Sequence, residues 1–221
     1  RIEGDLESVF ASLIENLESE VYREEAVATW RALGARLPAS PPALLESWIS
    51  GRLPGSVFVS LLDRTEASQR AEIAGRILRQ WRERTPETWR LGLFDQALWR
   101  FVAEEQPRAV AEEAFLLLQE GSEDRAANIE YPLRALTDGL PSRGRLHFLT
   151  RCAAEIEGWP VHRQTALLRL AAEMGPAATL IRSFVEQALQ SDAPRLRAEA
   201  VGVAAITPGL GGPLVASWPE L

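Results

Sequence analysis

The chain contains no lysine, one cysteine and two histidines, and these scarcities remove several kinds of chemistry. All 24 basic residues are arginine, which excludes a phosphate-loop lysine, a Schiff-base lysine and a protein-kinase lysine. A single cysteine excludes an intrachain disulfide, a Cys-x-x-Cys redox pair and a cysteine-based zinc finger. Two histidines leave few ligands for a transition metal, so we expect no metal and no cofactor.

Long apolar runs are also lacking. No segment approaches the roughly 20 apolar residues that a membrane-spanning helix needs, and the N-terminus has no basic-then-apolar signal pattern. We therefore expect no membrane partner and, with so little cysteine, a reducing cytoplasmic location. The chain begins with Arg1 rather than methionine, which leaves open that it is a segment of a longer protein.

The residues that are abundant favour helix. Of 221 residues, 46% are hydrophobic and 25% are charged, as in an ordinary globular protein. Alanine and leucine together number 63 (32 and 31), whereas tyrosine numbers two. Because alanine and leucine favour helix and aromatic residues favour strand, we expect an all-α fold.

Capping residues, prolines and glycines divide the chain into a regular series of helices. Only at Val57-Phe58-Val59 does the sequence not decide between helix and strand. Pro132 is expected to kink or split the helix in which it lies. The predicted helices cover 5–20, 22–36, 40–49, 55–62, 65–83, 86–104, 107–119, 123–138, 142–157, 160–174, 176–190 and 193–206.

A repeat period runs through the later helices. Similar helix openings recur with their second positions at residues 86, 123, 160 and 192, which gives spacings of 37, 37 and 32 residues. Each unit holds two helices. A period of 30–45 residues predicts an α-solenoid, in which successive helix pairs stack on one another.

The last unit resembles a HEAT repeat. It runs from Leu180 to Ala205, with Asp192 in the turn and then Leu196, Arg197 and Ala200 in the second helix. The resemblance implies a right-handed α-solenoid of stacked antiparallel helix pairs, although only this unit has the turn aspartate. It divides the chain into irregular N-terminal cap helices over 1–64, HEAT-like repeats over 65–206 and a tail over 207–221. The tail either folds back over the last repeat through Val215, Ala216 and Trp218, or marks where a longer protein was cut.

Charge is unevenly distributed along a chain whose net charge is −7. Residues 64–100 carry eight arginines and five acids, for a net charge of +3, and mix guanidinium with indole groups. Arginine and tryptophan are common anchors at protein interfaces, so this block is the predicted contact surface, extended by repeat register to two later arginines. The set comprises Arg76, Arg79, Trp81, Arg82, Trp89, Arg90, Arg125 and Arg163.

The leading hypothesis is a non-catalytic scaffold or regulatory domain that binds an acidic protein or peptide. The alternative is a nucleic-acid-binding or repair protein, since some HEAT-like arrays bind DNA, but the acidic net charge disfavours it. The sequence offers no catalytic constellation. His147 and Cys152 lie five residues apart on one predicted helix and face different ways, and Cys152 is expected to be buried. Glu105 and Glu112 could hold a hard cation, but nothing in the sequence requires it.

Overall fold

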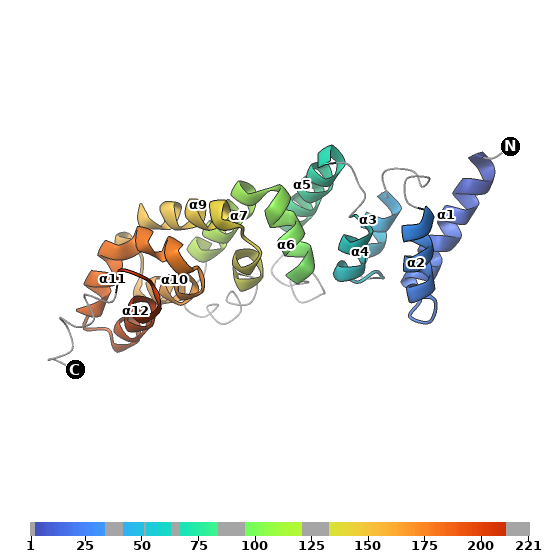
Figure 1. Ribbon diagram of the computed structural model, residues 1–221. Coiled ribbons are helices and arrows are strands. Elements are labelled where there is room, and N and C mark those ends of the chain that lie inside the picture. Colours follow the sequence, from blue (N-terminus) through green and yellow to red (C-terminus); the bar gives the residue numbers. More distant parts are fainter. Residues whose placement is uncertain are drawn as a thin grey trace. The chain divides into compact units, whose positions relative to one another are not determined.

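The computed structural model describes residues 3–33, 42–50, 52–62, 67–83, 96–120 and 133–210. In these ranges the chain consists of helices joined by turns, without any strand (Figure 1), and the predicted all-α fold is confirmed. No helix in the described ranges is long and apolar enough to cross a membrane. The chain divides into two compact units, Arg1–Glu105 (unit 1) and Gln106–Leu221 (unit 2). The boundary between these units, after Glu105, differs from the predicted boundary between cap and repeats, after residue 64. The cap and the repeats remain a prediction.

Unit 1 is built from six described helices, most of which begin and end within three residues of the predicted bounds. The helix α1 packs on α2 and α3, while α6 packs on α4 and α5. The bounds are α1 Glu3–Glu18, α2 Arg23–Leu33, α3 Pro42–Ile49, α4 Gly55–Leu61, α5 Ala67–Glu83 and α6 Gln96–Glu105. The predicted helix over 86–104 begins in residues outside the described ranges.

The structure settles the conformation of Val57-Phe58-Val59, which form part of the helix α4. The Phe58 N–H donates to the Pro54 carbonyl oxygen at 3.0 Å. The Phe58 ring is completely buried and stacks on Trp48 with centroids 5.9 Å apart. Tertiary packing therefore overrides the strand preference of the two valines.

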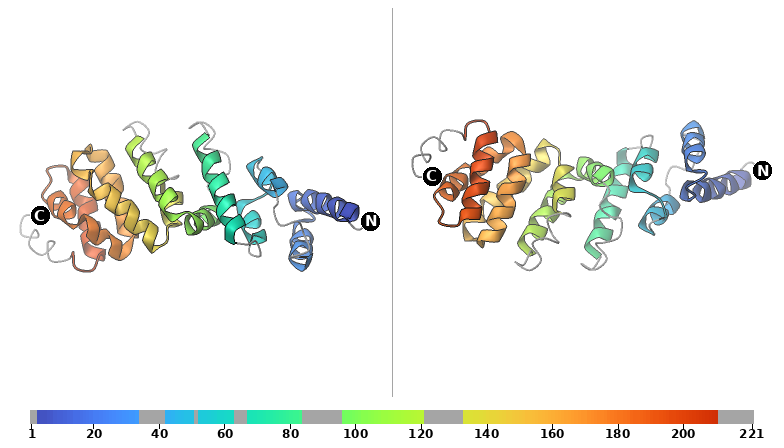
Figure 2. Two further views of the ribbon diagram at one scale, coloured as in Figure 1. Left: turned by 90° about the horizontal axis from the view of Figure 1, so that it is seen from above. Right: turned by 90° about the horizontal axis from the view of Figure 1, so that it is seen from below.

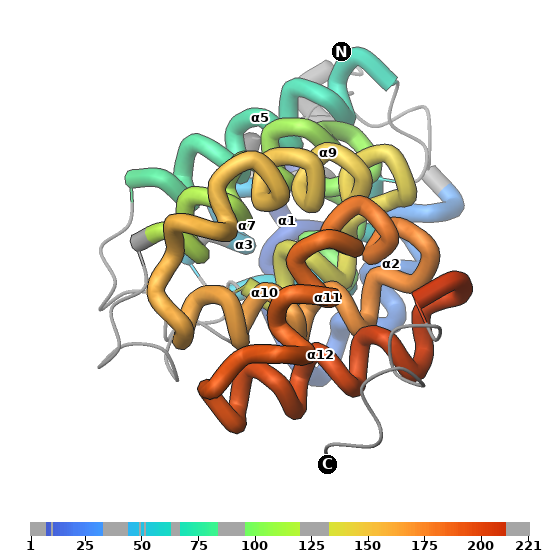
Figure 3. The backbone as a smooth tube through the Cα atoms, turned by 90° about the vertical axis from the view of Figure 1, so that its left-hand side faces the viewer, coloured from blue at the N-terminus to red at the C-terminus, as the bar shows by residue number. Residues whose placement is uncertain are grey.

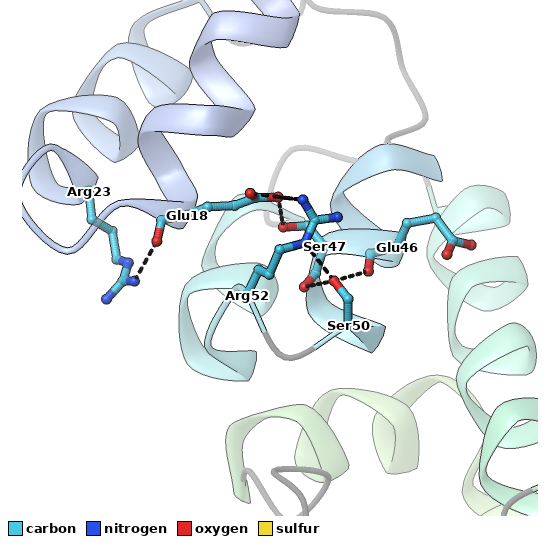
Figure 4. Close-up of polar contacts among 6 residues, drawn as sticks. All are labelled: Glu18, Arg23, Glu46, Ser47, Ser50 and Arg52. Atoms are coloured by element: carbon cyan, nitrogen blue, oxygen red, sulfur yellow. Dashed lines mark hydrogen bonds and ion pairs between the residues drawn. The ribbon is translucent and has the colours of Figure 1, made fainter.

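Glu18 joins the end of α1 to the α3 region of unit 1 (Figure 4). Its carboxylate accepts hydrogen bonds from the Ser47 hydroxyl at 2.6 Å and from Arg52 at 2.9 Å. Ser47 is buried, so this bond satisfies a polar group that would otherwise be costly to remove from water. The Arg23 guanidinium donates to the carbonyl oxygens of Leu17 and Glu18, which closes the α1–α2 turn.

In unit 2, helices that alternate along the chain contact one another. The helix α7 packs on α9, which in turn packs on η5, and α10 packs on α12. Figure 2 shows α7 beside α9 in its left-hand view and α10 beside α12 in its right-hand view. The bounds are α7 Pro107–Glu120, α9 Ser142–Ala153, η4 Ile156–Gly158, α10 Val161–Glu173, η5 Gly175–Ile181, α11 Arg182–Leu189 and α12 Pro194–Ile206, with a further short helical stretch over 133–138.

Two predicted helices of unit 2 are shorter than expected. The helix predicted over 176–190 begins as the 3₁₀ helix η5 and becomes α-helical only at Arg182. Gly175, the first residue of η5, has φ +62°, and Pro176 has no N–H to donate. The helix predicted over 142–157 ends at Ala153, because Glu155 leaves helical geometry with φ −128° and the chain re-forms as η4.

Gly144 allows α9 to approach α7 closely. A Cβ atom at this position would lie 2.8 Å from Leu140 Cδ2 and 3.3 Å from the Pro107 carbonyl oxygen. We expect Gly144→Ala to destabilise unit 2 by about 1–3 kcal/mol through overpacking. The matched control is Gly75→Ala in α5, where a Cβ atom would meet nothing within 4 Å; it should gain up to about 1 kcal/mol from helix propensity. Urea unfolding followed by circular dichroism measures both, and equal shifts of the same sign would contradict this account.

Candidate functional site

The helix α5 presents the best-described part of the predicted contact surface. Its apolar residues Ile73, Ile77 and Leu78 are buried in unit 1. Arg79 and Arg82 are exposed on other faces of the helix, and Arg76 is half-buried. The apolar spacing therefore directs these arginines away from the core, as the 3.6-residue helical period requires.

Trp81 does not belong to this exposed surface. Its side chain is only 5% exposed, and its ring meets the Trp99 ring of α6 edge-on, with centroids 5.0 Å apart and planes at 81°. This is a favoured geometry for an aromatic pair. The sequence set included Trp81 because it adjoins exposed arginines, but its position on the buried stripe makes it a core residue.

A further arginine of α5, Arg70, binds within unit 1. Its Nε donates to Glu105 of α6 at 2.8 Å, and its guanidinium carbon lies 5.5 Å from the centre of the Phe101 ring. The carboxylate of Glu105, which the sequence offers as a ligand for a hard cation, instead accepts a hydrogen bond from the Arg70 guanidinium. Arg70 joins α5 to α6.

For the remaining predicted contact residues, the structure defines no position relative to α5. Trp89, Arg90 and Arg125 lie outside the described residues. Arg163 is half-buried on α10 and belongs to unit 2, whereas α5 belongs to unit 1. The repeat register that groups them stays a prediction.

Sequence reasoning missed a row of polar side chains that links α7 with α9 and the turn after it in unit 2. His147 Nε2 lies 2.7 Å from Glu112 Oε1, and Arg151 donates to Glu155 at 2.9 Å. Gln119 donates to the other oxygen of Glu155 at 2.6 Å. We call these five residues the α7–α9 polar row. A signal for it existed, because 147, 151 and 155 are spaced by four residues and 112 and 119 by seven, which places each set on one helix face.

An aromatic pair lies against the α7–α9 polar row. The Arg151 guanidinium carbon is 4.3 Å from the centre of the Phe115 ring, which is 1% exposed. The Trp159 ring is tilted against Phe115 with centroids 6.0 Å apart. Arg151 thus contacts an aromatic face as well as two carboxylates, since its Nε also lies 3.7 Å from Glu112.

The chemistry of the α7–α9 polar row is that of a helix–helix contact. The side chains of His147, Glu112, Arg151 and Glu155 are each 34–42% exposed, so water screens the ion pairs of Arg151 and each contributes about 0.2–1 kcal/mol at most. Glu112 and the adjacent Glu113 point to different sides of α7, since Glu113 is buried while Glu112 reaches the row. The row holds α7 and α9 in register.

Cys152 lies on the buried side of α9 and is confirmed as a core residue. Its side chain is completely buried. Burial raises the pKa of the Cys152 thiol, and the negative charge of Glu155 adds to the effect. Because the thiolate is the reactive form, this thiol stays protonated and unreactive at neutral pH. His147, the only histidine on the same helix, is engaged by Glu112 instead.

Among the described residues, no group of three or more histidine, cysteine, aspartate or glutamate side chains is arranged to hold a metal ion. Comparison with protein-family models, with curated proteins and with solved structures finds no match to the chain. What the protein does must therefore be inferred from its helices, their packing and their charge.

Proposed function

We propose that the chain is a helical-repeat scaffold, a HEAT-like right-handed α-solenoid that binds a protein or peptide partner without catalysing a reaction. The observation that carries this proposal is the contact between alternate helices in unit 2. The helix α7 packs on α9, and α10 packs on α12. Such contacts are expected when one two-helix unit stacks on the next, because a single helix pair cannot bury its own apolar stripe.

Polar contacts in unit 2 support the same interpretation. They join Glu112 to His147 and Gln119 to Glu155, residues 35 and 36 apart in the sequence. Two further pairs, Arg134–Glu173 and Arg169–Glu199, span 39 and 30 residues. The first two separations fall within the period of 32–37 residues in the helix openings, and the other two lie two residues outside it. Separations near one period are expected if equivalent helices of successive units face one another.

The proposed domain organisation follows from this period. Helices before residue 65 do not share it and would form an irregular cap, while the repeats would extend to residue 206. A cytoplasmic location is proposed on the chain's single cysteine, since extracellular domains commonly rely on disulfides.

The proposed partner is acidic. On α5, Arg79 and Arg82 are exposed while the apolar side of the helix is buried. Guanidinium groups suit carboxylates because the planar fork can donate two parallel hydrogen bonds. An acidic peptide or an acidic protein surface therefore fits Arg76, Arg79 and Arg82, and Trp89, Arg90, Arg125 and Arg163 complete the proposed contact set.

Charge reversal tests this placement. Peptides selected from a displayed library against the full chain should carry net negative charge, and their affinity can be measured by fluorescence anisotropy. The double variant Arg79→Glu/Arg82→Glu should bind at least about tenfold more weakly, or about 1.4 kcal/mol. The control Arg31→Glu/Arg108→Glu changes two exposed arginines of α2 and α7 and shifts the net charge equally. Equal losses of affinity in both variants would show that α5 is not part of the binding surface.

Affinity capture with and without nuclease separates protein from nucleic-acid binding. Partners that persist after nuclease treatment support the scaffold. Loss of all partners on nuclease treatment, together with binding that falls steeply with salt, would replace the scaffold with the nucleic-acid alternative.

A further inference from the structure

The turn between α1 and α2 presents an aliphatic and an aromatic side chain to water. Val21 is 80% exposed and Tyr22 is 55% exposed. The turn is fixed from its inner side, because the Arg23 guanidinium donates to two carbonyl oxygens at the end of α1, at 3.0 and 3.3 Å. The Ala26 N–H donates to the Tyr22 carbonyl oxygen at 3.0 Å. Tyrosine is among the residues that most often anchor a protein interface, and here it stands on a preformed turn.

Carboxylates flank this exposed pair on both sides. Glu20 comes before it, and Glu24 and Glu25 follow in the first turn of α2; all three are exposed. In the described part of the chain, no ion pair engages their carboxylates. A surface that covers this turn must therefore be basic and must also pack on an aromatic ring. We call the five residues Glu20, Val21, Tyr22, Glu24 and Glu25 the α1–α2 tip.

The chain shows twice how an arginine engages an aromatic ring and a carboxylate together. On α6, Phe101 and Glu105 lie four residues apart. The guanidinium carbon of Arg70 of α5 lies 5.5 Å from the centre of that ring, and its Nε donates to that carboxylate at 2.8 Å. On α7, Phe115 and the glutamate three residues before it receive Arg151 of α9 in the same way, at 4.3 Å from the ring centre and 3.7 Å from the carboxylate. Both are contacts between two helices.

The α1–α2 tip offers the same pair of groups at the same spacing, since Tyr22 and Glu25 are three residues apart. Among the described residues, no arginine lies on the Tyr22 ring. Arginines are exposed on α5 of the same unit, at Arg79 and Arg82. In Figure 1 α3 and α4 stand between α2 and α5, and in Figure 3 α5 lies above α2, so the α1–α2 tip and α5 belong to separate parts of unit 1.

We propose that the α1–α2 tip of one copy of the chain binds the exposed arginines of α5 in a second copy. A guanidinium that enters the tip meets the Tyr22 ring and a carboxylate together, which adds cation–π attraction to a charge-assisted hydrogen bond. Opposite charge on the two surfaces favours the encounter of two copies. This inference rests on the function proposed for α5, because the acidic tip then competes with the acidic partner for one surface.

A complementation experiment on the full chain tests the proposal. Sedimentation velocity over a range of concentrations measures self-association, which should weaken as salt rises. The tip variant Glu24→Arg/Glu25→Arg and the α5 variant Arg79→Glu/Arg82→Glu should each associate at least about tenfold more weakly than the native chain. An equimolar mixture of the two variants should recover association, because one contributes a native tip and the other a native α5.

Matched variants control for net charge and for folding. Glu157→Arg/Glu186→Arg and Arg108→Glu/Arg195→Glu change exposed residues of unit 2 by the same charges and should associate like the native chain. Tyr22→Ala removes the ring at little cost in stability and should weaken association at least about fivefold. A chain that stays monomeric at every concentration would overturn the proposal, and so would a variant mixture that does not recover association.

An acidic peptide from the displayed library separates this inference from the proposed function. Arginine-dependent peptide binding in a chain that does not self-associate overturns only the contact between copies. Association that mixing restores, in a chain that binds no acidic peptide, overturns only the partner proposed for α5. If both proposals hold, the peptide should dissociate the copies, since both occupy the same arginines.

Discussion

Replacing Trp99 by alanine should lower the free energy of unfolding of unit 1 by about 3–5 kcal/mol. The Trp99 side chain of α6 is completely buried and packs against Trp81 of α5. Truncation removes its transfer free energy, leaves a cavity in a close-packed interior, and removes the edge-on contact with Trp81. Few point substitutions reach this size, and opening a cavity in the core is one of the few mechanisms that do so.

Urea unfolding followed by circular dichroism, with hydrogen exchange of peptides from α5 and α6, measures this loss and assigns it to unit 1. The control is Tyr22→Ala, which removes a 55% exposed aromatic residue of the same unit and should change stability by about 0.5 kcal/mol or less. A double-mutant cycle with Trp81→Ala should show coupling of about 0.5–1.5 kcal/mol. Similar losses in Trp99→Ala and Tyr22→Ala would show that the α5–α6 core is packed differently.

Replacing Phe115 by alanine should destabilise unit 2 by a similar amount, about 3–5 kcal/mol. The ring is 1% exposed and lies under Arg151 and against Trp159. Its loss opens a cavity and also removes the aromatic face that holds the Arg151 guanidinium between Glu112 and Glu155. Hydrogen exchange should therefore accelerate in both α7 and α9.

The neighbouring residue provides the control for Phe115. Leu116 is 44% exposed on the same helix, so Leu116→Ala should cost less than about 1 kcal/mol. A second variant, Arg151→Ala, measures the α7–α9 polar row separately and should cost about 1–2 kcal/mol, since its ion pairs are partly exposed. If Leu116→Ala proved as damaging as Phe115→Ala, the assigned faces of α7 would be wrong.

These two substitutions also separate stability from binding. Neither side chain belongs to the proposed contact set, and neither change alters the charge of α5. Under conditions in which they remain folded, the Trp99→Ala and Phe115→Ala variants should therefore bind an acidic peptide as tightly as the unchanged chain. The Arg79→Glu/Arg82→Glu variant should instead lose binding while keeping its stability.

Helix positions followed from local sequence because their signals are local. Ser142 is the first residue of α9, and Pro194 stands at the start of α12 as expected, although neither helix has a side-chain cap hydrogen bond. Local signals left Val57-Phe58-Val59 open between helix and strand, and the structure has a helix there, with Phe58 packed on Trp48. The structure departs from the prediction after Ala153, where the chain leaves the helix and the Ile156 carbonyl oxygen accepts a hydrogen bond from Gln164, eight residues later.

The candidate site shows the same division. Arg79 is exposed because the apolar spacing of α5 places it opposite Ile77 and its buried neighbours. Trp81 was grouped with the exposed arginines because it adjoins them in the sequence, but it lies on the buried face of α5 and packs on Trp99 of α6. The α7–α9 polar row was hidden for a related reason, since His147 and Glu112 are 35 residues apart and meet only when two helices pack.

By itself the sequence determined the all-α class, the positions of most helices, the burial of Cys152 and the exclusion of lysine and disulfide chemistry. Each of these depends on composition or on residues within one or two helical turns. Tertiary structure alone decided which helices pair, which arginines bind inside a unit, and which tryptophans belong to the core. Those outcomes depend on side chains brought together from distant parts of the chain. The free energy of their packing, rather than local helix propensity, decides which side of each helix is buried.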